Sequence, residues 1–253
     1  MAARVARALP MILDVLPERT GGAAENMAAD FLLLQRYPRT GAARYRHYGW
    51  RSPAFTFGYS QKISYVRGQL PLGETFDLCR RPTGGGLVDH REDWTYALVI
   101  PRGHLLEEVR ATQSYCAIHE ALAGSLSAAG VPVSLKPASK PASKPAAGAE
   151  PGGPAGVCFE RAEIFDIVHA VTGAKIAGGA QKRNKRGLLF QGSVWKPAAA
   201  DNLDWDGFGE DFAARLADAL GAQASPCPWP EFNEDEANGL VERYSSPEWM
   251  EFR

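Results

Sequence analysis

The chain has 253 residues, of which 45% are hydrophobic, and its formal net charge is -1 at neutral pH. A chain of this length can bury a full hydrophobic core, and its near-neutral charge argues against nucleic acid as the main partner. The first apolar run, residues 8–16, is interrupted by Pro10 and Asp14 and is too short to span a bilayer, so we expect a cytoplasmic protein without a membrane segment.

The four cysteines, Cys79, Cys116, Cys158 and Cys227, lie far apart and show neither a C-x-x-C pair nor a zinc-like spacing with histidine. A chain this long does not need disulfides to hold its core. We therefore expect free thiols and no metal site, and each thiol is a candidate for reactivity.

The first 101 residues are predicted to contain one helix followed by strands. Apolar residues recur at helical spacing from Ala24 to Arg36, and the pattern stops before Pro38. The stretches "ARYRHYGW" and "AFTFGYS" that follow are rich in aromatic residues, which is typical of strands. Two more strands, "LCRRPT" and "WTYALVIP", are predicted on either side of a glycine run, which we expect to connect them.

After these strands the composition changes abruptly. Residues 105–129 have the apolar periodicity of one long helix that ends at Gly130. Residues 136–156, "KPASKPASKPAAGAEPGGPAG", contain no apolar side chain larger than those of Ala and Pro. Such a segment cannot offset the entropy of its own ordering, which predicts a flexible loop.

Beyond this loop, strand and helix patterns return. The stretch "EIFDIVHAVTGAKIAGGAQ" predicts a hairpin that turns near Thr172 and Gly173, and "GLLFQGSVW" predicts a further strand. Helices are predicted over residues 206–220 and after Asn233. Paired strands with helices between them favour an α+β fold with a mixed or antiparallel sheet over a Rossmann fold. We expect residues 1–253 to form a single domain.

The stretch "CRRPTGGGLVDH", residues 79–90, combines two arginines with three glycines. Gly84, Gly85 and Gly86 leave the backbone bare, so that successive N–H groups can form a concavity for an anionic or carbonyl ligand. Arg80 and Arg81 can bind a phosphate or carboxylate with two hydrogen bonds. The pattern is neither a Walker loop nor G-x-G-x-x-G, and a hairpin turn with solvated arginines explains it equally well.

A second stretch, "GAKIAGGAQKR", residues 173–183, places Lys175 beside Ile176 on a predicted strand. Because side chains alternate along a strand, Lys175 faces a ligand cleft if Ile176 faces the core. The alternative is a surface lysine near a hairpin. The basic run from Lys182 to Arg186 is either a solvated turn or a docking point for an acidic carrier protein.

Cys158 lies directly after the predicted loop and just before a predicted strand. A thiol at its reference pKa is only a few per cent thiolate at neutral pH, so a nucleophilic role requires a nearby cation. The predicted hairpin can bring Lys175 to it. The alternative is that Cys158 is a small buried hydrophobic residue.

These motifs, in this order, resemble the lipoate-protein ligase and octanoyltransferase family. "RRPTGGGLVDH" and "GAKIAGGAQKR" match best, and "ENMAADFLLL", "RYRHYGWRSPAFTFGYSQ" and "RYSSPEWM" extend the resemblance over almost the whole chain. It implies the fold of the biotin and lipoate ligase catalytic domain, with a mixed, mainly antiparallel sheet flanked by helices. It also implies that Lys175 is the essential lysine. The implied acyl and substrate pocket comprises Arg80, Arg81, Thr83, Gly84, Gly85, Gly86, His90, Asp166, Gly178 and Ala180.

Within that family the chain resembles the cysteine-dependent octanoyltransferases, because Cys158 stands just before the strand that leads into "KIAG". The resemblance implies that an octanoyl or lipoyl group passes from acyl carrier protein to Cys158 as a thioester. The acyl group would then move to a lysine of a lipoyl domain or of the glycine-cleavage H protein. Lys175 would stabilise the thiolate, and no metal or nucleotide would be needed.

Other functions stay open. An ATP-dependent lipoate ligase would act through lipoyl-AMP and require ATP and Mg²⁺, and an amidotransferase would take its octanoyl group from the H protein. A non-catalytic module that binds an acyl group or a protein would need neither Cys158 nor Lys175. A nucleic-acid-binding function depends only on "KRNKR". Cys79, beside the arginine pair, competes with Cys158 as the candidate nucleophile.

Overall fold

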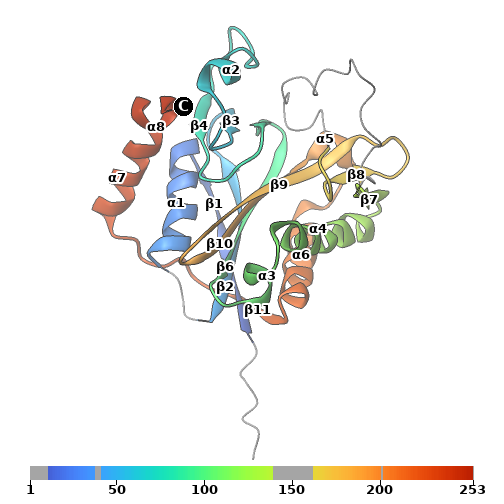
Figure 1. Cartoon of the computed structure of the whole chain (residues 1–253). Coiled ribbons are helices and arrows are strands. Elements are labelled where there is room, and N and C mark those ends of the chain that lie inside the picture. Colours follow the sequence, from blue (N-terminus) through green and yellow to red (C-terminus); the bar gives the residue numbers. More distant parts are fainter. Residues whose placement is uncertain (1–10, 38–40, 139–161, 201, 253) are drawn as a thin grey trace, which may run out of the picture.

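The computed structural model describes residues 11–37, 41–138, 162–200 and 202–252 (Figure 1). The strands are β1 (Met11–Gly21), β2 (Ala42–Trp50), β3 (Ala54–Phe57), β4 (Asp77–Arg80), β5 (Leu87–Asp89), β6 (Asp93–Pro101), β7 (Val133–Leu135), β8 (Ile167–His169), β9 (Lys175–Asn184), β10 (Gly187–Trp195) and β11 (Ala222–Pro226). The helices are α1 (Ala23–Gln35), α2 (Ile63–Arg67), α3 (Leu105–Glu108), α4 (Ala111–Ala128), α5 (Lys196–Ala199), α6 (Trp205–Ala219), α7 (Glu234–Ser245) and α8 (Pro247–Glu251). None of them is long and apolar enough to cross a membrane.

The main sheet has eight strands in the order β11-β1-β2-β6-β10-β9-β8-β7. β1 pairs in parallel with both of its neighbours, and all the other pairs in this sheet are antiparallel. The predicted α+β fold with a mixed, mainly antiparallel sheet is therefore confirmed. β8 and β9 form the predicted hairpin, which turns through Gly173 at φ +72°.

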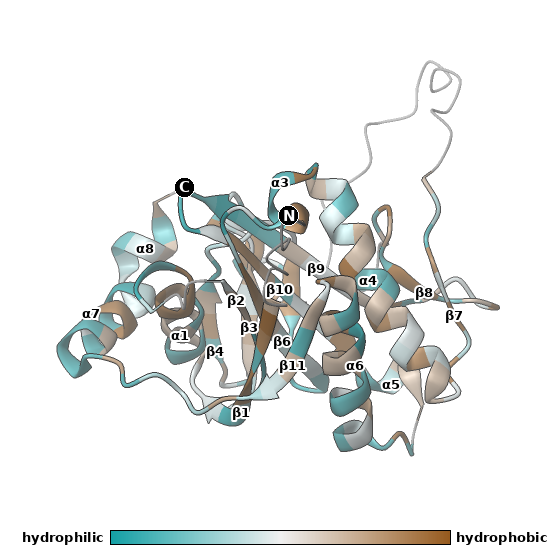
Figure 2. Ribbon diagram, turned by 90° about the horizontal axis from the view of Figure 1, so that it is seen from below, coloured by the Kyte–Doolittle hydropathy of each residue, from teal (hydrophilic) through white to brown (hydrophobic). Residues whose placement is uncertain are grey.

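Helices cover both faces of this sheet. Figures 1 and 2 show α1, α7 and α8 on one side of the strands and α4 and α6 on the other. Alternate residues of the central strands serve the two faces: Leu98 and Phe190 belong to the core with α4 and α6, whereas Val99 and Leu189 pack with Leu33 of α1. The alternation expected of strands thus produces two apolar layers.

A second, three-stranded sheet has the order β4-β3-β5. The sequence predicted that the glycine run connects β4 directly to β6, and this prediction is wrong. The run leads from β4 into the short strand β5, whose residues Leu87, Val88 and Asp89 pair antiparallel with β3. The three-residue length of β5 explains why the pattern missed it, since alternation cannot be recognised over so few positions.

The predicted helix over residues 105–129 is two helices, α3 and α4. Val109 and Arg110 between them are extended, with ψ angles of 167° and 147°. Arg183 of β9 stabilises this break, because its guanidinium donates to the carbonyl oxygens of Glu107 at 2.9 Å and Val109 at 3.1 Å. Arg183 is therefore not part of a solvated turn. Most of the predicted flexible loop, residues 139–156, lies outside the described residues.

β1 was not predicted, because Asp14 interrupts its apolar pattern. In the fold, Asp14 is 1% exposed and lies opposite Arg44 of β2, with 3.8 Å between Asp14 Oδ2 and Arg44 Nε. A buried carboxylate beside a buried guanidinium is compatible with a strand interior, although the sequence alone does not reveal the pairing.

A buried ion pair joins α1 to the main sheet. Arg46 of β2 donates from Nε to Asp30 of α1 at 2.7 Å, and the two side chains are 1% and 0% exposed. The same guanidinium donates to the carbonyl oxygen of Asn26 at 2.8 Å and lies 3.8 Å from the centre of the Tyr48 ring. The position of α1 over the sheet therefore depends on satisfied buried charges as well as on apolar packing.

We expect the substitution Asp30→Ala to lower the free energy of unfolding by about 3–5 kcal/mol, because it leaves the Arg46 guanidinium buried without its counter-ion. Denaturant unfolding followed by tryptophan fluorescence measures the loss. The double substitution Asp30→Leu with Arg46→Met removes both charges and should recover much of the stability. A loss below about 1 kcal/mol in the single variant would contradict the importance of this pair.

Candidate active site

A cavity of about 460 Å³, measured with its open mouth, lies between the main sheet, the small sheet and α1. β9 and β10 supply one wall, β3, β5 and the glycine run another, and Met27 of α1 contributes to the lining. Most of its exposed lining is apolar, and several polar groups converge on it. Such an arrangement is typical of a site for a small, partly apolar ligand.

The structure brings six of the predicted site residues to this cavity. They are Arg81, Gly85, His90, Lys175, Gly178 and Ala180. Thr83, Gly84, Gly86 and Asp166 lie directly behind these residues and contact them or their neighbours through hydrogen bonds. Cys158 lies outside the described residues. The binding roles expected of these residues stay predictions.

Lys175 points into the cavity and forms an ion pair with Asp166. Its Nζ lies 2.8 Å from Asp166 Oδ2, and the two side chains are 4% and 1% exposed. Ile176, the next residue, is fully buried in the core on the α4 side of the sheet. The prediction that these two neighbours face opposite ways is confirmed. A lysine this deeply buried keeps its charge only if a counter-ion accompanies it.

A β-bulge sets the direction of Lys175. The register of β8 against β9 shifts so that Ile167 pairs with Ala177 but Val168 pairs with Lys175. Ile176 and Ala177 consequently both face the core, and Lys175 joins Gly178 and Ala180 on the cavity side. In a regular strand Lys175 and Gly178 would lie on opposite faces, because three positions separate them.

Gly178 makes room for this lysine. A Cβ at position 178 would lie 2.7 Å from both Cε and Nζ of Lys175 and 3.2 Å from Asp166 Oδ1. The glycine is therefore required by the side chain that crosses it. Its own backbone is not in the left-handed region, so conformational freedom is not the reason for it.

Asp166 is held from several sides. Its Oδ2 accepts the backbone N–H of Glu163 at 2.6 Å, and its Oδ1 accepts the hydroxyl of Tyr115 from α4. The preceding residue, Phe165, has a φ of +66°, which is uncommon for a residue with a side chain. His119, one turn after Tyr115 on α4, lies with Nδ1 2.6 Å from the carbonyl oxygen of Phe165. α4 thus fixes both the backbone and the carboxylate of this segment.

Arg81 shapes the glycine run. One terminal nitrogen donates to the carbonyl oxygen and the hydroxyl of Thr56, each at 2.9 Å, and the other donates to the carbonyl oxygens of Gly84 at 2.7 Å and Gly86 at 2.9 Å. Gly85 between them has a φ of +88°, a conformation that glycine adopts without strain. The four terminal N–H groups of Arg81 therefore hold the curved cavity wall. Its contact with a ligand head group stays a prediction.

Arg80 is the last residue of β4 and does not line the cavity. It donates to the carbonyl oxygens of Trp249 and Met250 at 3.1 and 2.6 Å. It also donates to those of Tyr59 and Gln61 at 2.8 and 2.7 Å. The expectation that both arginines serve the pocket is corrected for Arg80, which fastens the C-terminal helix α8 to the small sheet.

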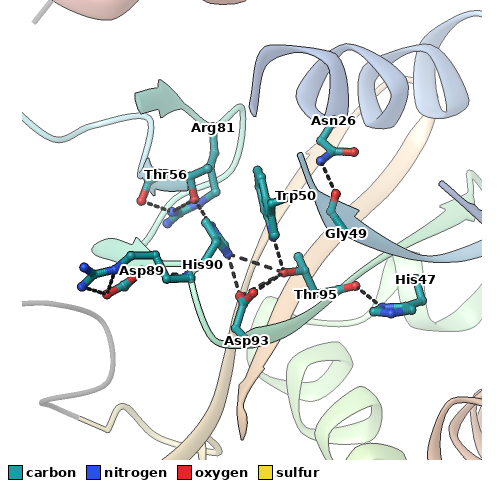
Figure 3. A network of polar contacts seen from close by, with 11 residues as sticks. Asn26, His47, Gly49, Trp50, Thr56, Arg81, Asp89, His90, Asp93 and Thr95 are labelled. Carbon is teal, nitrogen blue, oxygen red and sulfur yellow. Dashed lines mark hydrogen bonds and ion pairs between the residues drawn. The ribbon is translucent and has the colours of Figure 1, made fainter. Parts of the chain in front are cut away.

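A chain of hydrogen bonds fixes His90 at the cavity wall (Figure 3). The Trp50 indole N–H donates to the Thr95 hydroxyl at 2.9 Å, and this hydroxyl donates to Asp93. The same carboxylate lies 2.6 Å from His90 Nδ1, and His90 Nε2 lies 2.7 Å from the Thr56 hydroxyl. Since a carboxylate only accepts, Nδ1 carries a proton. The network ends at Thr56, which Arg81 also contacts.

The glycine run is also tied to the ion pair beneath α1. The Thr83 hydroxyl donates to Oε1 of Gln191 at 2.7 Å, and Gln191 donates from Nε2 to Asp30 at 2.6 Å. Gln191 lines the cavity from β10. Gln191 therefore connects the helix, the sheet and the glycine run. No sequence motif indicates this role, because a single glutamine within a strand has no recognisable spacing to other residues.

Cys79 is not available as a nucleophile. Its side chain is 1% exposed in the core between α1 and α7. Burial raises the pKa of its thiol to about 12, so the thiolate is negligible at neutral pH. This leaves Cys158 as the candidate that the sequence pattern favours.

Four residues around the site were not predicted from the sequence: Tyr115, His119, Thr56 and Gln191. For the first two a weak signal exists, because a tyrosine and a histidine four residues apart occupy one face of a predicted amphipathic helix. An apolar stripe explains that spacing equally well, so their contact with Asp166 and Phe165 required the structure.

Comparison with known proteins gives a consistent result. Residues 22–203 match the lipoyl protein ligase A/B catalytic domain family. The chain is 28% identical over 265 residues to "Octanoyltransferase LipM" of Symbiobacterium thermophilum, covering 89% of this chain and 93% of that protein. It is 33% identical over 180 residues to the protein of the same name from Oceanobacillus iheyensis, covering 68% of this chain and 59% of that one.

Two solved structures share the fold. A putative lipoate protein ligase from T. acidophilum with bound lipoic acid superposes with a TM-score of 0.71 at 18% identity and covers 96% of this chain and 99% of its own. A lipoate-protein ligase A bound with ATP gives a TM-score of 0.68 at 18% identity, with coverages of 96% and 98%. At this identity they establish the fold alone.

The buried His119 predicts a pH dependence of stability. Burial lowers its pKa to about 4, whereas an unfolded chain has a histidine pKa of roughly 6.5. Between these pH values the unfolded state therefore binds more protons than the folded state. The contribution of His119 to the free energy of unfolding is complete above pH 6.5 and is lost as the pH falls toward 4.

Denaturant unfolding of the parent and of His119→Gln measures this loss. In this pH window the free energy of unfolding of the parent should fall by up to about 1.4 kcal/mol per pH unit more than that of the variant. Parallel slopes would contradict the assignment.

Proposed function

Because the chain belongs to the lipoyl protein ligase A/B catalytic domain family, we propose that it is an acyltransferase that moves an octanoyl group onto a lysine side chain in protein lipoylation. The observation that carries the proposal is the buried Lys175–Asp166 pair at the wall of an apolar, glycine-lined cavity. Relatives named octanoyltransferase that align over nearly their whole length support the same activity.

The lining of the cavity supports an acyl thioester as the substrate. Met27 and Val88 contribute apolar side chains and Gly178 contributes bare backbone, which suits a hydrocarbon chain. We expect the Lys175 ammonium to stabilise the negative charge that develops on the thioester carbonyl oxygen or on a departing thiolate. Charge stabilisation by a group already in place needs no reorganisation during the reaction.

The reaction proceeds in two steps. The Cys158 thiolate attacks the octanoyl thioester of acyl carrier protein, the new carbon–sulfur bond replaces the old one, and the carrier thiol leaves with a proton. An amine of a lipoyl-domain or H-protein lysine then attacks the acyl-enzyme, loses a proton and forms the amide, and the Cys158 thiol is released. Lys175 stabilises the thiolate and takes part in the proton transfers. Exchange of one thioester for another is close to isoenergetic, so the first step depends mainly on positioning.

This mechanism requires no metal or nucleotide. The rival activity is ATP-dependent ligation, which one solved structure of the same fold makes relevant because it contains ATP. The two activities differ in what they consume. A transferase uses an acyl thioester, whereas a ligase uses a free acid together with ATP and Mg²⁺.

The deciding experiment is the intact mass of the protein after it is mixed with octanoyl-acyl carrier protein without ATP. We expect the parent to gain one octanoyl group that hydroxylamine removes, and we expect Cys158→Ala to gain none. Cys79→Ala is the matched control, because its thiol is buried in the core, and it should acquire the adduct like the parent.

Two results would contradict this proposal. An adduct that persists in Cys158→Ala would place the nucleophile elsewhere. Modification of a lipoyl domain that occurs only with free octanoate or lipoate, ATP and Mg²⁺ would identify a ligase in which Cys158 has no chemical role.

The substitution Gly178→Ala should impair octanoyl transfer in a protein that still folds. The new Cβ meets Cε and Nζ of Lys175 at 2.7 Å, so Lys175 must shift within its buried pair with Asp166, and we expect the free energy of unfolding to fall by about 1–3 kcal/mol. Octanoyl transfer should fall on the order of 100-fold, because a misplacement of about 1 Å is that costly. Gly239→Ala on α7, where a Cβ meets nothing within 4 Å, is the control. Unchanged transfer by Gly178→Ala would contradict a role for Lys175 at its observed position.

A further inference from the structure

Tyr115 reaches from α4 to the buried ion pair behind the cavity. Its hydroxyl donates to Oδ1 of Asp166, while Lys175 occupies Oδ2 at 2.8 Å. The hydroxyl oxygen also accepts the backbone N–H of Gly179 at 3.0 Å. One phenol group thus joins α4, the carboxylate and β9, the strand that carries the lysine.

The direction of this hydrogen bond is fixed. Burial, together with the negative charge of Asp166, holds the pKa of Tyr115 well above its usual range, so the phenol stays protonated. A carboxylate only accepts, and the N–H of Gly179 only donates. The hydroxyl also lies 3.2 Å from the carbonyl oxygen of Gly179. Donation to Asp166 is favoured over donation to that carbonyl, because hydrogen bonds to an ionised carboxylate are stronger.

The backbone that carries Asp166 is held by the same helix. His119 donates from Nδ1 to the carbonyl oxygen of Phe165, whose φ of +66° is costly to maintain. The rings of Tyr115 and His119 lie 4.2 Å apart between centroids, and Phe190 packs against both at 5.5 and 5.6 Å. Tyr115 is therefore held in a rigid aromatic group, as accurate positioning of a carboxylate requires.

We propose that Tyr115 is a positioning residue for the acyl-transfer reaction: it orients the Asp166 carboxylate so that the ammonium group of Lys175 points into the cavity. Tyr115 itself does not line the cavity and touches no substrate. The proposal depends on the proposed function, in which Lys175 acts on the acyl group. Without the hydroxyl, Asp166 Oδ1 and the N–H of Gly179 each lose a hydrogen-bond partner. The carboxylate is then free to rotate, and the Lys175 ammonium group moves with it because the two are paired.

The first test compares Tyr115→Phe with Tyr96→Phe. Tyr96 is a matched control because its hydroxyl is also buried, has no hydrogen-bond partner within the described part of the chain, and belongs to a ring that stacks on Phe190. We expect Tyr115→Phe to lower kcat for octanoyl transfer about 10- to 100-fold, with KM for the acyl donor changed less than about threefold. Tyr96→Phe should retain the parent rate.

A double-mutant cycle shows whether Tyr115 acts through Asp166. If it does, Tyr115→Phe added to Asp166→Asn causes little further loss, because the carboxylate it orients is already gone. Two losses that multiply would overturn the proposal, as would an equal loss in Tyr96→Phe. A Tyr115→Phe chain that fails to fold while Tyr96→Phe folds would also overturn it, since the hydroxyl would then be structural.

A third measurement does not depend on activity. Brief treatment of the native protein with acetic anhydride, followed by peptide mass spectrometry, reports how often the Lys175 amine is released from Asp166. We expect acetylation of Lys175 to be about fivefold faster in Tyr115→Phe, which corresponds to one weakened hydrogen bond, and unchanged in Tyr96→Phe. An unchanged rate in Tyr115→Phe would overturn the proposal. A parent that transfers no octanoyl group would refute the proposed function, and the labelling would still decide the role of Tyr115.

Discussion

The burial of one positive charge governs the architecture around the cavity. The side chain of Lys175 is 4% exposed. A protein tolerates the removal of an ammonium group from water only beside a counter-ion whose own hydrogen-bonding groups have partners. Asp166 meets this condition through the N–H of Glu163 and the hydroxyl of Tyr115. The bulge in β9 and the bare backbone of Gly178 are the features that allow the lysine to reach it.

The opposite wall uses the same principle with different residues. Arg81 donates to the carbonyl oxygens of Gly84 and Gly86. These hydrogen bonds fix the backbone of the glycine run, although it contains three consecutive glycines. Gln191 then connects the run to the pair formed by Asp30 and Arg46. Each wall is thus supported by a buried ion pair: Lys175 with Asp166 on one side and Arg46 with Asp30 on the other. A site built in this way is rigid before substrate arrives, which limits the reorganisation required during catalysis.

The sequence predicted those parts of the structure that depend on local pattern. Alternation placed Lys175 opposite Ile176, and turn chemistry located the hairpin near Gly173. Features that depend on distant partners were beyond it: Arg80 and Arg81 are adjacent and chemically identical, yet one serves α8 and the other the cavity wall. Tyr115 meets a residue 51 positions away, and no spacing within α4 indicates that contact. Strand β5 was not recognised because it is only three residues long. The break before α4 was not recognised because it depends on contacts with the distant Arg183.

The attachment of Arg80 to α8 has a consequence for how the cavity forms during synthesis. Its acceptors at Trp249 and Met250 lie 169 and 170 residues further along the chain. At typical translation speeds these residues emerge roughly 10 to 30 seconds after Arg80. Until then Arg80 donates only to the carbonyl oxygens of Tyr59 and Gln61, and its remaining N–H groups stay hydrated. The order of synthesis therefore leaves β4, the strand that leads into the glycine run, without its α8 contact until residues 249 and 250 have emerged.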